Sequence, residues 1–306
     1  MVEHQIPRSA YSRFFFKKHL RLIQAFLNRN EHRPNYDDID VVDEIVAPYR
    51  ALLKEPLPKK PDDTPKHIWL LWQQGWEHAP PLVKACAKSW QDLNPGWEVH
   101  LLDEKSLLDF APDYAGIKAQ KISRAAQSDV ARLCLLKENG GVWADATILC
   151  HQPLDAWLPK VMEQGFFMFA DPRPYRYSEI WFLASAKNTY LMETWFNLVC
   201  DYWRHFSRPH HYYWMAYLFE FLALRDEKIA HLWRRVPKLS ANGPHIVQAH
   251  RFNATPPNSS LSVVEQGVLP LHKLSHKWRF SGSLKGTPVG LLTGLDRLQG
   301  NIKDAS

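Results

Sequence analysis

Two oxygen-bearing side chains, Asp145 and Thr147, stand two residues apart directly after the apolar run Val142-Trp143-Ala144. A short apolar run of this kind predicts a buried strand. Because side chains alternate across a strand, residues i and i+2 at its end point the same way. Carboxylate and hydroxyl oxygens suit hard cations, so the pair predicts a site where Mg²⁺ or Mn²⁺ holds a diphosphate. Taken alone, Asp145 could equally begin an ordinary turn.

The residues before this strand predict the helix that must position it. Val130, Leu133 and Leu136 recur every three residues with polar residues between them, the pattern of a helix that buries one face. Asn139-Gly140-Gly141 predicts its end, because glycine readily adopts the left-handed conformation of a helix cap. A helix therefore leads directly into the strand that carries Asp145.

Asp129 and Arg132 lie three residues apart on this helix, and an i, i+3 pair shares one helix face. In a functional interpretation the two side chains contact a sugar nucleotide. In a structural interpretation they form a surface ion pair. Each feature taken singly favours the structural interpretation, whereas together they form a recognisable pattern.

The stretch SDVARLCLLKENGGVWADATIL, residues 128–149, resembles the signature SD-x-x-R…GG-x-[YW]-x-D-x-D of sugar transferases that include yeast mannosyltransferases and clostridial glucosylating toxins. It is most similar to bacterial capsular polysaccharide synthesis proteins, in which the ending D-A-T is usual. IWLLWQQG at residues 68–75 and SW-x-x-L-N-P-G-W-E-x-x-L-L-D at 89–103 are also similar to this family. One departure is Thr147, which stands where the wider family has a second Asp and makes that ligand neutral.

The resemblance implies a GT-A-like fold, a nucleoside diphosphate sugar as donor, with a UDP-sugar favoured, and Mn²⁺ or Mg²⁺ as cofactor. It implies Asp145, Asp129 and Arg132 as catalytic residues. It implies Asp145, Thr147 and a C-terminal histidine, His276, as metal ligands. The residues expected to bind the donor are Trp72, Gln73, Ser128, Asp129, Arg132, Trp143, Ala144, Asp145 and Lys277.

Residues 65–150 predict strand, helix, strand, helix and strand, the order of a Rossmann-like sheet. Trp72 follows the first strand, at the edge where open α/β sheets bind ligands, so it either stacks on a nucleotide base or belongs to the core. No G-x-G-x-x-G and no G-x-x-x-x-G-K-[ST] is present, which disfavours dinucleotide and P-loop chemistry. We therefore expect an α/β fold with a mostly parallel sheet flanked by helices.

Composition indicates a globular protein, since 45% of the 306 residues are hydrophobic and 23% are charged. Thirteen Trp and 13% aromatic residues exceed what a core needs, which suggests a sugar-binding cleft or an aromatic-rich core. The four cysteines show no C-x-x-C and are expected to be reduced thiols in a cytoplasmic protein. Neither an 18-residue apolar run nor a secretory signal is present, so we do not expect the chain to cross a membrane.

The positive charge is concentrated at the N-terminus. Residues 1–35 contain seven Lys and Arg against two Glu, a net +5 of the total +6. The remaining chain is nearly neutral, which argues against a nucleic-acid-binding domain.

An amphipathic helix is predicted over residues 12–29, with an apolar and a basic face. The helix would lie on an anionic membrane surface or pack on the body with its basic side in water. Residues 30–65, rich in Pro and Asp, predict a linker or wrapped arm, so we expect an N-terminal extension over 1–60 and a GT-A-like domain over 61–306. The apolar face comprises Phe16, Leu20, Ile23 and Leu27, and the basic face Lys17, Lys18 and Arg21.

The C-terminal half is expected to complete the fold, with strands at 166–171 and 180–184 and aromatic-rich helices at 189–205 and 211–225. Asp171 at a strand end would face the acceptor or act as a base, or simply cap a loop. His272 is the rival of His276 for the metal–diphosphate site, and either could be an ordinary surface histidine.

We therefore expect a metal-dependent glycosyltransferase that moves a sugar from a nucleoside diphosphate sugar to a capsular polysaccharide or its lipid-linked precursor. It would act in the cytoplasm, peripherally on the inner face of the cytoplasmic membrane. The alternative is a non-catalytic carbohydrate-binding or assembly protein on the same fold, favoured by the missing second Asp. A nucleotidyl-transferring or phosphate-cleaving enzyme is disfavoured by the lack of a Gly-rich loop.

Overall fold

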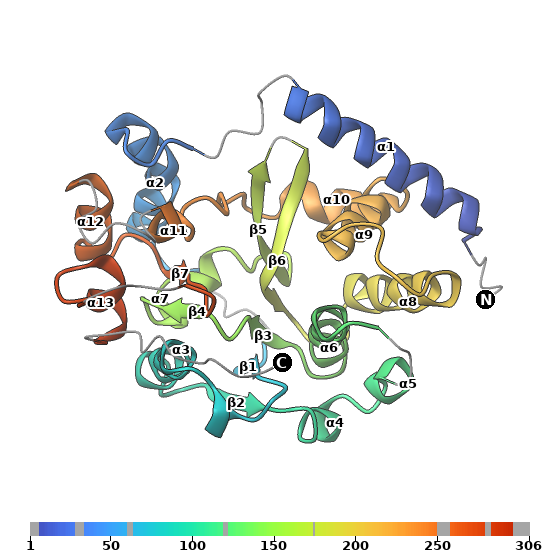
Figure 1. Ribbon diagram of the computed structural model, residues 1–306, viewed down its shortest axis with the longest axis horizontal. Helices are drawn as coiled ribbons and strands as arrows, with labels where there is room; N and C mark the ends of the chain where they lie inside the picture. Colours follow the sequence, from blue (N-terminus) through green and yellow to red (C-terminus); the bar gives the residue numbers. More distant parts are fainter. Residues whose placement is uncertain are drawn as a thin grey trace.

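A five-stranded sheet lies at the centre of the protein (Figure 1). The computed structural model describes residues 6–27, 34–59, 64–118, 122–173, 175–249, 258–278 and 283–295. A second, two-stranded sheet pairs β4 (Ile148–Cys150) with β7 (Leu271–Lys273). In spatial order the strands of the large sheet are β2 (Glu98–Leu102), β1 (His67–Leu71), β3 (Gly141–Ala144), β6 (Arg176–Ser185) and β5 (Phe166–Arg173).

The sheet is mixed rather than mostly parallel. Strand β1 runs parallel to both β2 and β3, as predicted. Strand β6 runs antiparallel to β3 and to β5. For β5 and β6 the reason is that they are consecutive in the chain and that Arg173 pairs with Arg176, three residues on. A hairpin joins antiparallel strands, whereas parallel neighbours need a longer crossover.

Helices flank the sheet on both sides. Helix α6 packs on β1 and β3 and α9 on β6, while α3 contacts β2 and β4 on the other side (Figure 1). Two short 3₁₀ helices are η1 (Trp76–His78) and η2 (Leu158–Lys160). The α-helices are α1 (Arg8–Leu27), α2 (Ile39–Lys54), α3 (Pro81–Leu93), α4 (Leu107–Phe110), α5 (Tyr114–Lys118), α6 (Arg124–Asn139), α7 (Leu154–Trp157), α8 (Tyr190–His205), α9 (Trp214–Ala223), α10 (Glu227–Arg235), α11 (Ile246–Ala249), α12 (Asn258–Glu265) and α13 (Pro288–Thr293).

The two glycines after α6 set the approach of β3 to β1. Gly140 caps α6 with a φ of 69°, which confirms the predicted helix end. Gly141 has a φ of 92°, and a Cβ there would lie 2.5 Å from the carbonyl oxygen of His67 in β1. Side chains rarely adopt such a φ, so glycine serves both the turn and the close strand contact.

The N-terminal helix α1 packs on α8 and α9, but not through the predicted face. Tyr11 is buried and donates from its hydroxyl to Oδ2 of Asp201 at 2.8 Å. Lys18 is also buried and forms an ion pair with Glu220 in α9. The assignment of Lys18 to a solvated basic face is therefore wrong, because a buried acid supplies its partner.

The predicted apolar face of α1 points into solvent instead. Phe16, Leu20 and Ile23 are 63%, 43% and 42% exposed. The side chain of Leu27 and residues 28 and 29 lie outside the described part of the chain. No helix among the described residues is long and apolar enough to span a membrane.

The expected linker contains a helix that belongs to the core. Helix α2 includes Pro48 and buries Val42, Val46, Tyr49 and Leu52 in the same hydrophobic core as the central sheet. The wrapped-arm alternative therefore describes residues 39–54. The core is aromatic-rich: Trp72 and Trp76 are partly buried, and the other Trp side chains are buried.

Candidate functional site

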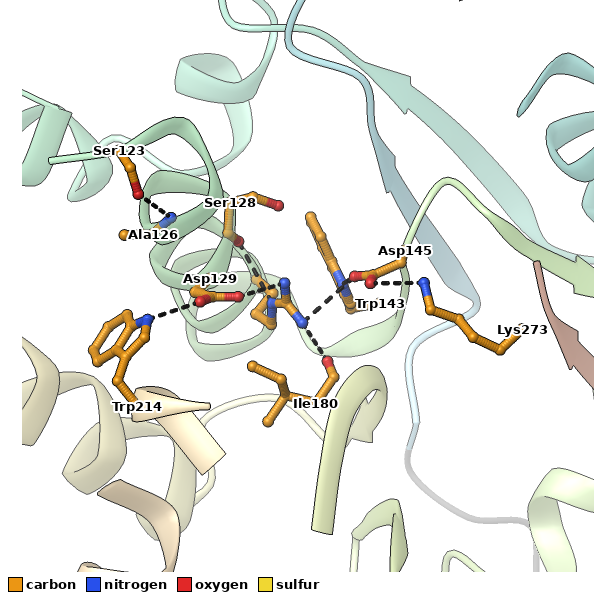
Figure 2. Close-up of polar contacts among 10 residues, drawn as sticks. Ser123, Ala126, Ser128, Asp129, Trp143, Asp145, Ile180, Trp214 and Lys273 are labelled. Atoms are coloured by element: carbon orange, nitrogen blue, oxygen red, sulfur yellow. Dashed lines mark hydrogen bonds and ion pairs between the residues drawn. The ribbon is translucent and has the colours of Figure 1, made fainter. Parts of the chain in front are cut away.

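Arg132 on α6 forms ion pairs with two carboxylates, Asp129 on the same helix and Asp145 after β3. Figure 2 labels the two carboxylates. Nη2 of Arg132 donates to Oδ1 of Asp129 at 2.8 Å, and its Nη1 lies 3.4 Å from Oδ1 of Asp145. Nη1 also donates to the backbone carbonyl of Ile180 in β6, and Nε lies 3.5 Å from the carbonyl of Ser128. Because the Arg132 side chain is only 5% exposed, these contacts hold its guanidinium in one place.

Asp129 fixes the position of the Arg132 side chain on the same helix. Its Oδ1 accepts from Arg132, and its Oδ2 accepts from Nε1 of Trp214 in α9 at 2.9 Å. Burial raises the pKa of Asp129 to about 6; the Arg132 charge opposes this rise and the Asp145 charge adds to it. Both oxygens already have protein partners, so the geometry makes Asp129 a positioning residue; its predicted catalytic role stays a prediction.

Asp145 and Thr147 both contact the Lys273 ammonium, although they lie in a turn and not on the strand whose alternation predicted a common direction. Nζ of Lys273 donates to Oγ1 of Thr147 at 2.8 Å and lies 3.3 Å from Oδ2 of Asp145. Nε1 of Trp143 donates to the other Asp145 oxygen at 3.1 Å (Figure 2). The two side chains belong to a turn between β3 and β4, closed by the Ile148 N–H, which donates to the Asp145 carbonyl at 2.8 Å.

The charges around Asp145 keep it ionised. Burial by itself would raise its pKa, but the charges of Lys273 and Arg132 and hydrogen bonds from Trp143 and Lys273 outweigh burial and lower it. Nearby Glu179 behaves oppositely, because burial raises its pKa despite an opposing Arg176 charge. The site thus contains one firmly ionised carboxylate beside acids that keep their protons to higher pH.

A divalent cation does not fit the site as these side chains are arranged. Mg²⁺ and Mn²⁺ need several oxygen ligands, but the ammonium of Lys273 sits between the oxygens of Asp145 and Thr147. Among the described residues, no group of three His, Cys, Asp or Glu ligand atoms within 4.8 Å of one another includes Asp145. Binding of the expected Mn²⁺ or Mg²⁺ at Asp145 would therefore require the Lys273 ammonium to move away.

The two candidate histidines lie in different environments. His276 is exposed, and its ring meets the Trp72 ring edge-on with centroids 5.4 Å apart. His272 is fully buried, with Nε2 3.0 Å from Nδ1 of His151. It precedes Lys273 in β7, and neighbouring side chains of a strand point to opposite faces, so His272 points away from Asp145.

Trp72 lies beside the Asp145–Thr147 turn. It is half-buried and packs in a small apolar cluster with Ala79, Val83 and Ala146, the residue between Asp145 and Thr147. The ring therefore borders the site, in agreement with either stacking or packing.

The other predicted donor-binding side chains are spread over different environments. Ala144 is fully buried and Trp143 is 1% exposed, so Trp143 reaches the site through its Nε1 contact with Asp145. Gln73 is half-buried after β1, and Lys277 is exposed in the turn after β7. Asp171 lies in β5 with a left-handed φ of 47°. Their roles stay predictions.

The sequence analysis missed Lys273 and a second basic group, Arg176. Nη2 of Arg176 donates to Oε1 of Glu179 at 2.6 Å, and its guanidinium lies 3.6 Å from the ring centroid of Tyr213. Arg176 is buried, and its Nε and Nη1 have no hydrogen-bond partner among the described residues. No local motif marks either residue, because both depend on strand pairing.

The chain matches one protein family over most of its length. The family described as "Capsular polysaccharide synthesis protein" covers residues 23–288. This range includes α6, β3, the Asp145–Thr147 turn and Lys273.

Parts of the chain are similar in sequence to individual proteins. "O-glycosyltransferase PaGT" of Phomopsis amygdali is 27% identical over 151 residues, covering 44% of this chain and 35% of that protein. "Inositol phosphoceramide mannosyltransferase 1" of Schizosaccharomyces pombe is 26% identical over 160 residues, covering 49% of this chain and 48% of that protein. The chain therefore spans about half or less of the length of these relatives.

Among solved structures, "PaToxG Glycosyltransferase" matches with a TM-score of 0.37 and 16% identity, over 68% of this chain and 86% of that chain.

Proposed function

Because the chain belongs to the capsular polysaccharide synthesis protein family, we propose that it is a glycosyltransferase that moves a sugar from a nucleoside diphosphate sugar to a cell-surface glycan or its lipid-linked precursor. The observation that carries the proposal is the ionised Asp145 carboxylate, held by Arg132, Trp143 and Lys273 after β3. Open α/β sheets bind their ligands at this edge. Two proteins that match part of the chain, an O-glycosyltransferase and a mannosyltransferase by name, support the proposal. The donor we favour is a UDP-sugar.

The exposed fraction of each side chain indicates whether a ligand can reach it or whether it supports the site from within the protein. Asp145 is 28% exposed and Lys273 17%, so a ligand can touch both. Arg132, at 5%, is buried and holds Asp145 from within the protein, and Asp129 in turn holds Arg132. Asp145 would accept hydrogen bonds from hydroxyls of the donor sugar.

Lys273 supplies positive charge where the reaction needs it. When the bond between sugar and diphosphate breaks, negative charge develops on the departing diphosphate, and a cation held in place stabilises it. The Lys273 ammonium, fixed by Thr147 and Asp145, is such a cation.

The ammonium also agrees with the departure at Thr147. Two carboxylates with one divalent cation are electrically neutral, and so are one carboxylate and one ammonium. Replacing the second Asp by Thr removes one negative charge from the site and so reduces its demand for a divalent cation. On this proposal, transfer needs no added Mn²⁺ or Mg²⁺.

We also propose that α1 rests on an anionic membrane surface, such as the inner face of the cytoplasmic membrane. Phe16, Leu20 and Ile23 recur at helical spacing and form one exposed stripe on the side of α1 away from its buried face. Lys17 and Arg21 are exposed beside this stripe. An apolar stripe flanked by basic side chains is typical of a helix that lies in a lipid interface.

The central test is donor hydrolysis and donor binding by the purified protein over a set of nucleoside diphosphate sugars. Asp145→Asn keeps the side-chain shape and removes its charge, so it should lower nucleotide release by about 10²–10³-fold without unfolding the protein. Full activity of Asp145→Asn would overturn the assignment of the site. A wild-type protein that binds glycan but releases no nucleotide from any donor would support the non-catalytic alternative.

A further inference from the structure

Three metal-ligating side chains meet at the amino ends of β1 and β2, at the opposite end of β1 from Trp72. They are His67, which begins β1, and Glu98 and His100 in β2. His67 pairs with Glu98 in the parallel register, and Glu98 and His100 are two residues apart, so they share one face of the strand. Their ligand atoms all lie within 4.8 Å of one another.

The distances between the three ligand atoms match those of a tetrahedral zinc site. Nδ1 of His67 lies 3.1 Å from Nε2 of His100 and 3.4 Å from Oε2 of Glu98. Nε2 of His100 lies 3.7 Å from the same Glu98 oxygen. Zinc bonds of about 2.0–2.2 Å place tetrahedral ligand atoms roughly 3.3–3.6 Å apart. Shifts of a few tenths of an ångström would therefore seat the ion.

The kind of ligand also favours zinc over the cations expected at Asp145. Two imidazoles and one carboxylate suit Zn²⁺ and related transition metals, whereas Mg²⁺ and Mn²⁺ prefer oxygen ligands. The side chain of Glu98 is 67% exposed and that of His67 34%. Water can thus reach the fourth coordination position.

The ring of His100 is held in place before any metal binds. It is buried and stacks on Trp69, with ring centroids 4.1 Å apart and an interplanar angle of 14°. Trp69 is itself fixed by donating from Nε1 to the Gly140 carbonyl at 2.8 Å. A fixed imidazole loses little conformational freedom on binding a metal, which favours affinity.

We propose that His67, Glu98 and His100 bind one Zn²⁺ ion that ties β2, an edge strand of the central sheet, to β1. The length of β1 separates this site from the carboxyl edge by about 13 Å, so the ion stabilises the sheet and takes no part in transfer. The proposal does not depend on the proposed glycosyltransferase activity. Without metal, the same three side chains form a hydrogen-bonded group.

The test uses protein freed of metal with a chelator and then titrated with ZnCl₂ by calorimetry. We expect one zinc per chain and a rise in melting temperature, because an ion bound only by the folded state stabilises it. Glu98→Gln and His67→Gln should each weaken zinc binding about tenfold or more and reduce the rise. Both residues reach the surface, so these variants should still fold. Co²⁺ in place of Zn²⁺ should give the visible absorption of a tetrahedral centre.

Glu77→Gln is the matched control. Oε1 of Glu77 lies 3.4 Å from Nε2 of His78, the same separation as between Glu98 and His67, but the described residues offer no third ligand there. This variant should bind zinc as the wild type does. Absence of saturable zinc binding in the wild type would overturn the proposal. So would equal zinc affinity in the wild type, Glu98→Gln and His67→Gln.

Discussion

The Lys273 ammonium lies 3.3 Å from the Asp145 carboxylate, although 128 residues separate the two in the chain. Strand β7 brings them together, because it pairs with β4 directly after the Asp145–Thr147 turn and places Lys273 opposite Ile148. The C-terminal part of the chain thus delivers a cation to the end of the central strand. On the proposed function, this ammonium group neutralises negative charge on the departing diphosphate.

Exchanging the ammonium for a carboxylate should change the metal requirement. Lys273→Ala should lower kcat/KM measured without added metal by about 10²-fold, since it removes a fixed positive charge beside the leaving group. Adding Thr147→Asp to this variant rebuilds two carboxylates, so activity should return only with Mn²⁺. The measurement is kcat/KM against Mn²⁺ concentration for the wild type and both variants.

Lys88→Ala is the control for this exchange, because Lys88 pairs with Asp92 on the surface of α3. Its loss should change neither kcat/KM nor the dependence of kcat/KM on Mn²⁺. Repeating the assay in a Glu98→Gln background separates any effect of zinc on stability from the metal requirement of the donor site. A wild-type protein that transfers sugar only with Mn²⁺ or Mg²⁺ would reject the role of Lys273 and leave the proposed activity standing.

Asp129 should make stability depend on pH between about 4 and 6. Burial raises its pKa in the folded protein to about 6, whereas an unfolded Asp titrates near about 3.9. Between these values the folded state binds a proton that the unfolded chain lacks, so the Asp129 contribution to the free energy of unfolding falls as pH rises. Asp129→Asn should remove this contribution, which amounts to about 3 kcal/mol across the window. Thermal unfolding of both proteins from pH 4 to 7 measures it; parallel curves would show that Asp129 does not titrate there.

Trp72→Ala should weaken donor binding about ten- to a hundredfold, because stacking of a base on an aromatic ring contributes roughly 1–3 kcal/mol. Trp72→Phe keeps an aromatic face and should retain most of the affinity. Trp76→Ala is the control, since Trp76 packs against the same small cluster, and it should lower stability with little effect on donor affinity. Calorimetric titration with the donor and melting curves distinguish the outcomes. If Trp72→Ala melts earlier but binds donor normally, the ring serves packing alone.

Local signals explain what the sequence predicted well. The end of α6 at Asn139 follows from the glycine pair, β1 and β3 follow from short apolar runs, and β2 follows from alternating apolar and polar residues. Asp129, Arg132 and Asp145 come together because α6 and β3 are consecutive in the chain and the turn between them is tight. These relationships span few residues, so periodicity and caps are enough to predict them.

Distant contacts explain what the sequence could not predict. Helical periodicity places Lys18 among exposed basic residues, but its partner Glu220 is 202 residues away and buried. Lys273 gives no local sign of approaching Asp145, because only the pairing of β7 with β4 brings it there. Helix α2 was missed because Pro48 and the surrounding prolines resemble a linker, while its buried face depends on the body it covers.

The outward face of α1 should bind vesicles that contain anionic lipid. Lys17→Glu with Arg21→Glu removes two attractive charges worth about 1 kcal/mol each, so binding should weaken about thirtyfold or more. Replacing Phe16, Leu20 and Ile23 by Ser should also reduce binding, because these exposed side chains would enter the interface. Sedimentation with phosphatidylserine-containing vesicles measures both, and donor hydrolysis should remain unchanged.

The neighbouring lysines of α1 give a sharp control. Lys17 is exposed, whereas Lys18 is buried against Glu220 and donates to the carbonyl of Tyr175 at 2.6 Å. Lys18→Ala leaves a buried carboxylate without its cation and should destabilise the fold by about 3–5 kcal/mol, a loss seen in the melting temperature. Lys17→Ala should leave the melting temperature unchanged and weaken only vesicle binding. If the variants of the exposed face sediment with vesicles as the wild type does, α1 is a packing element and its apolar stripe does not meet lipid.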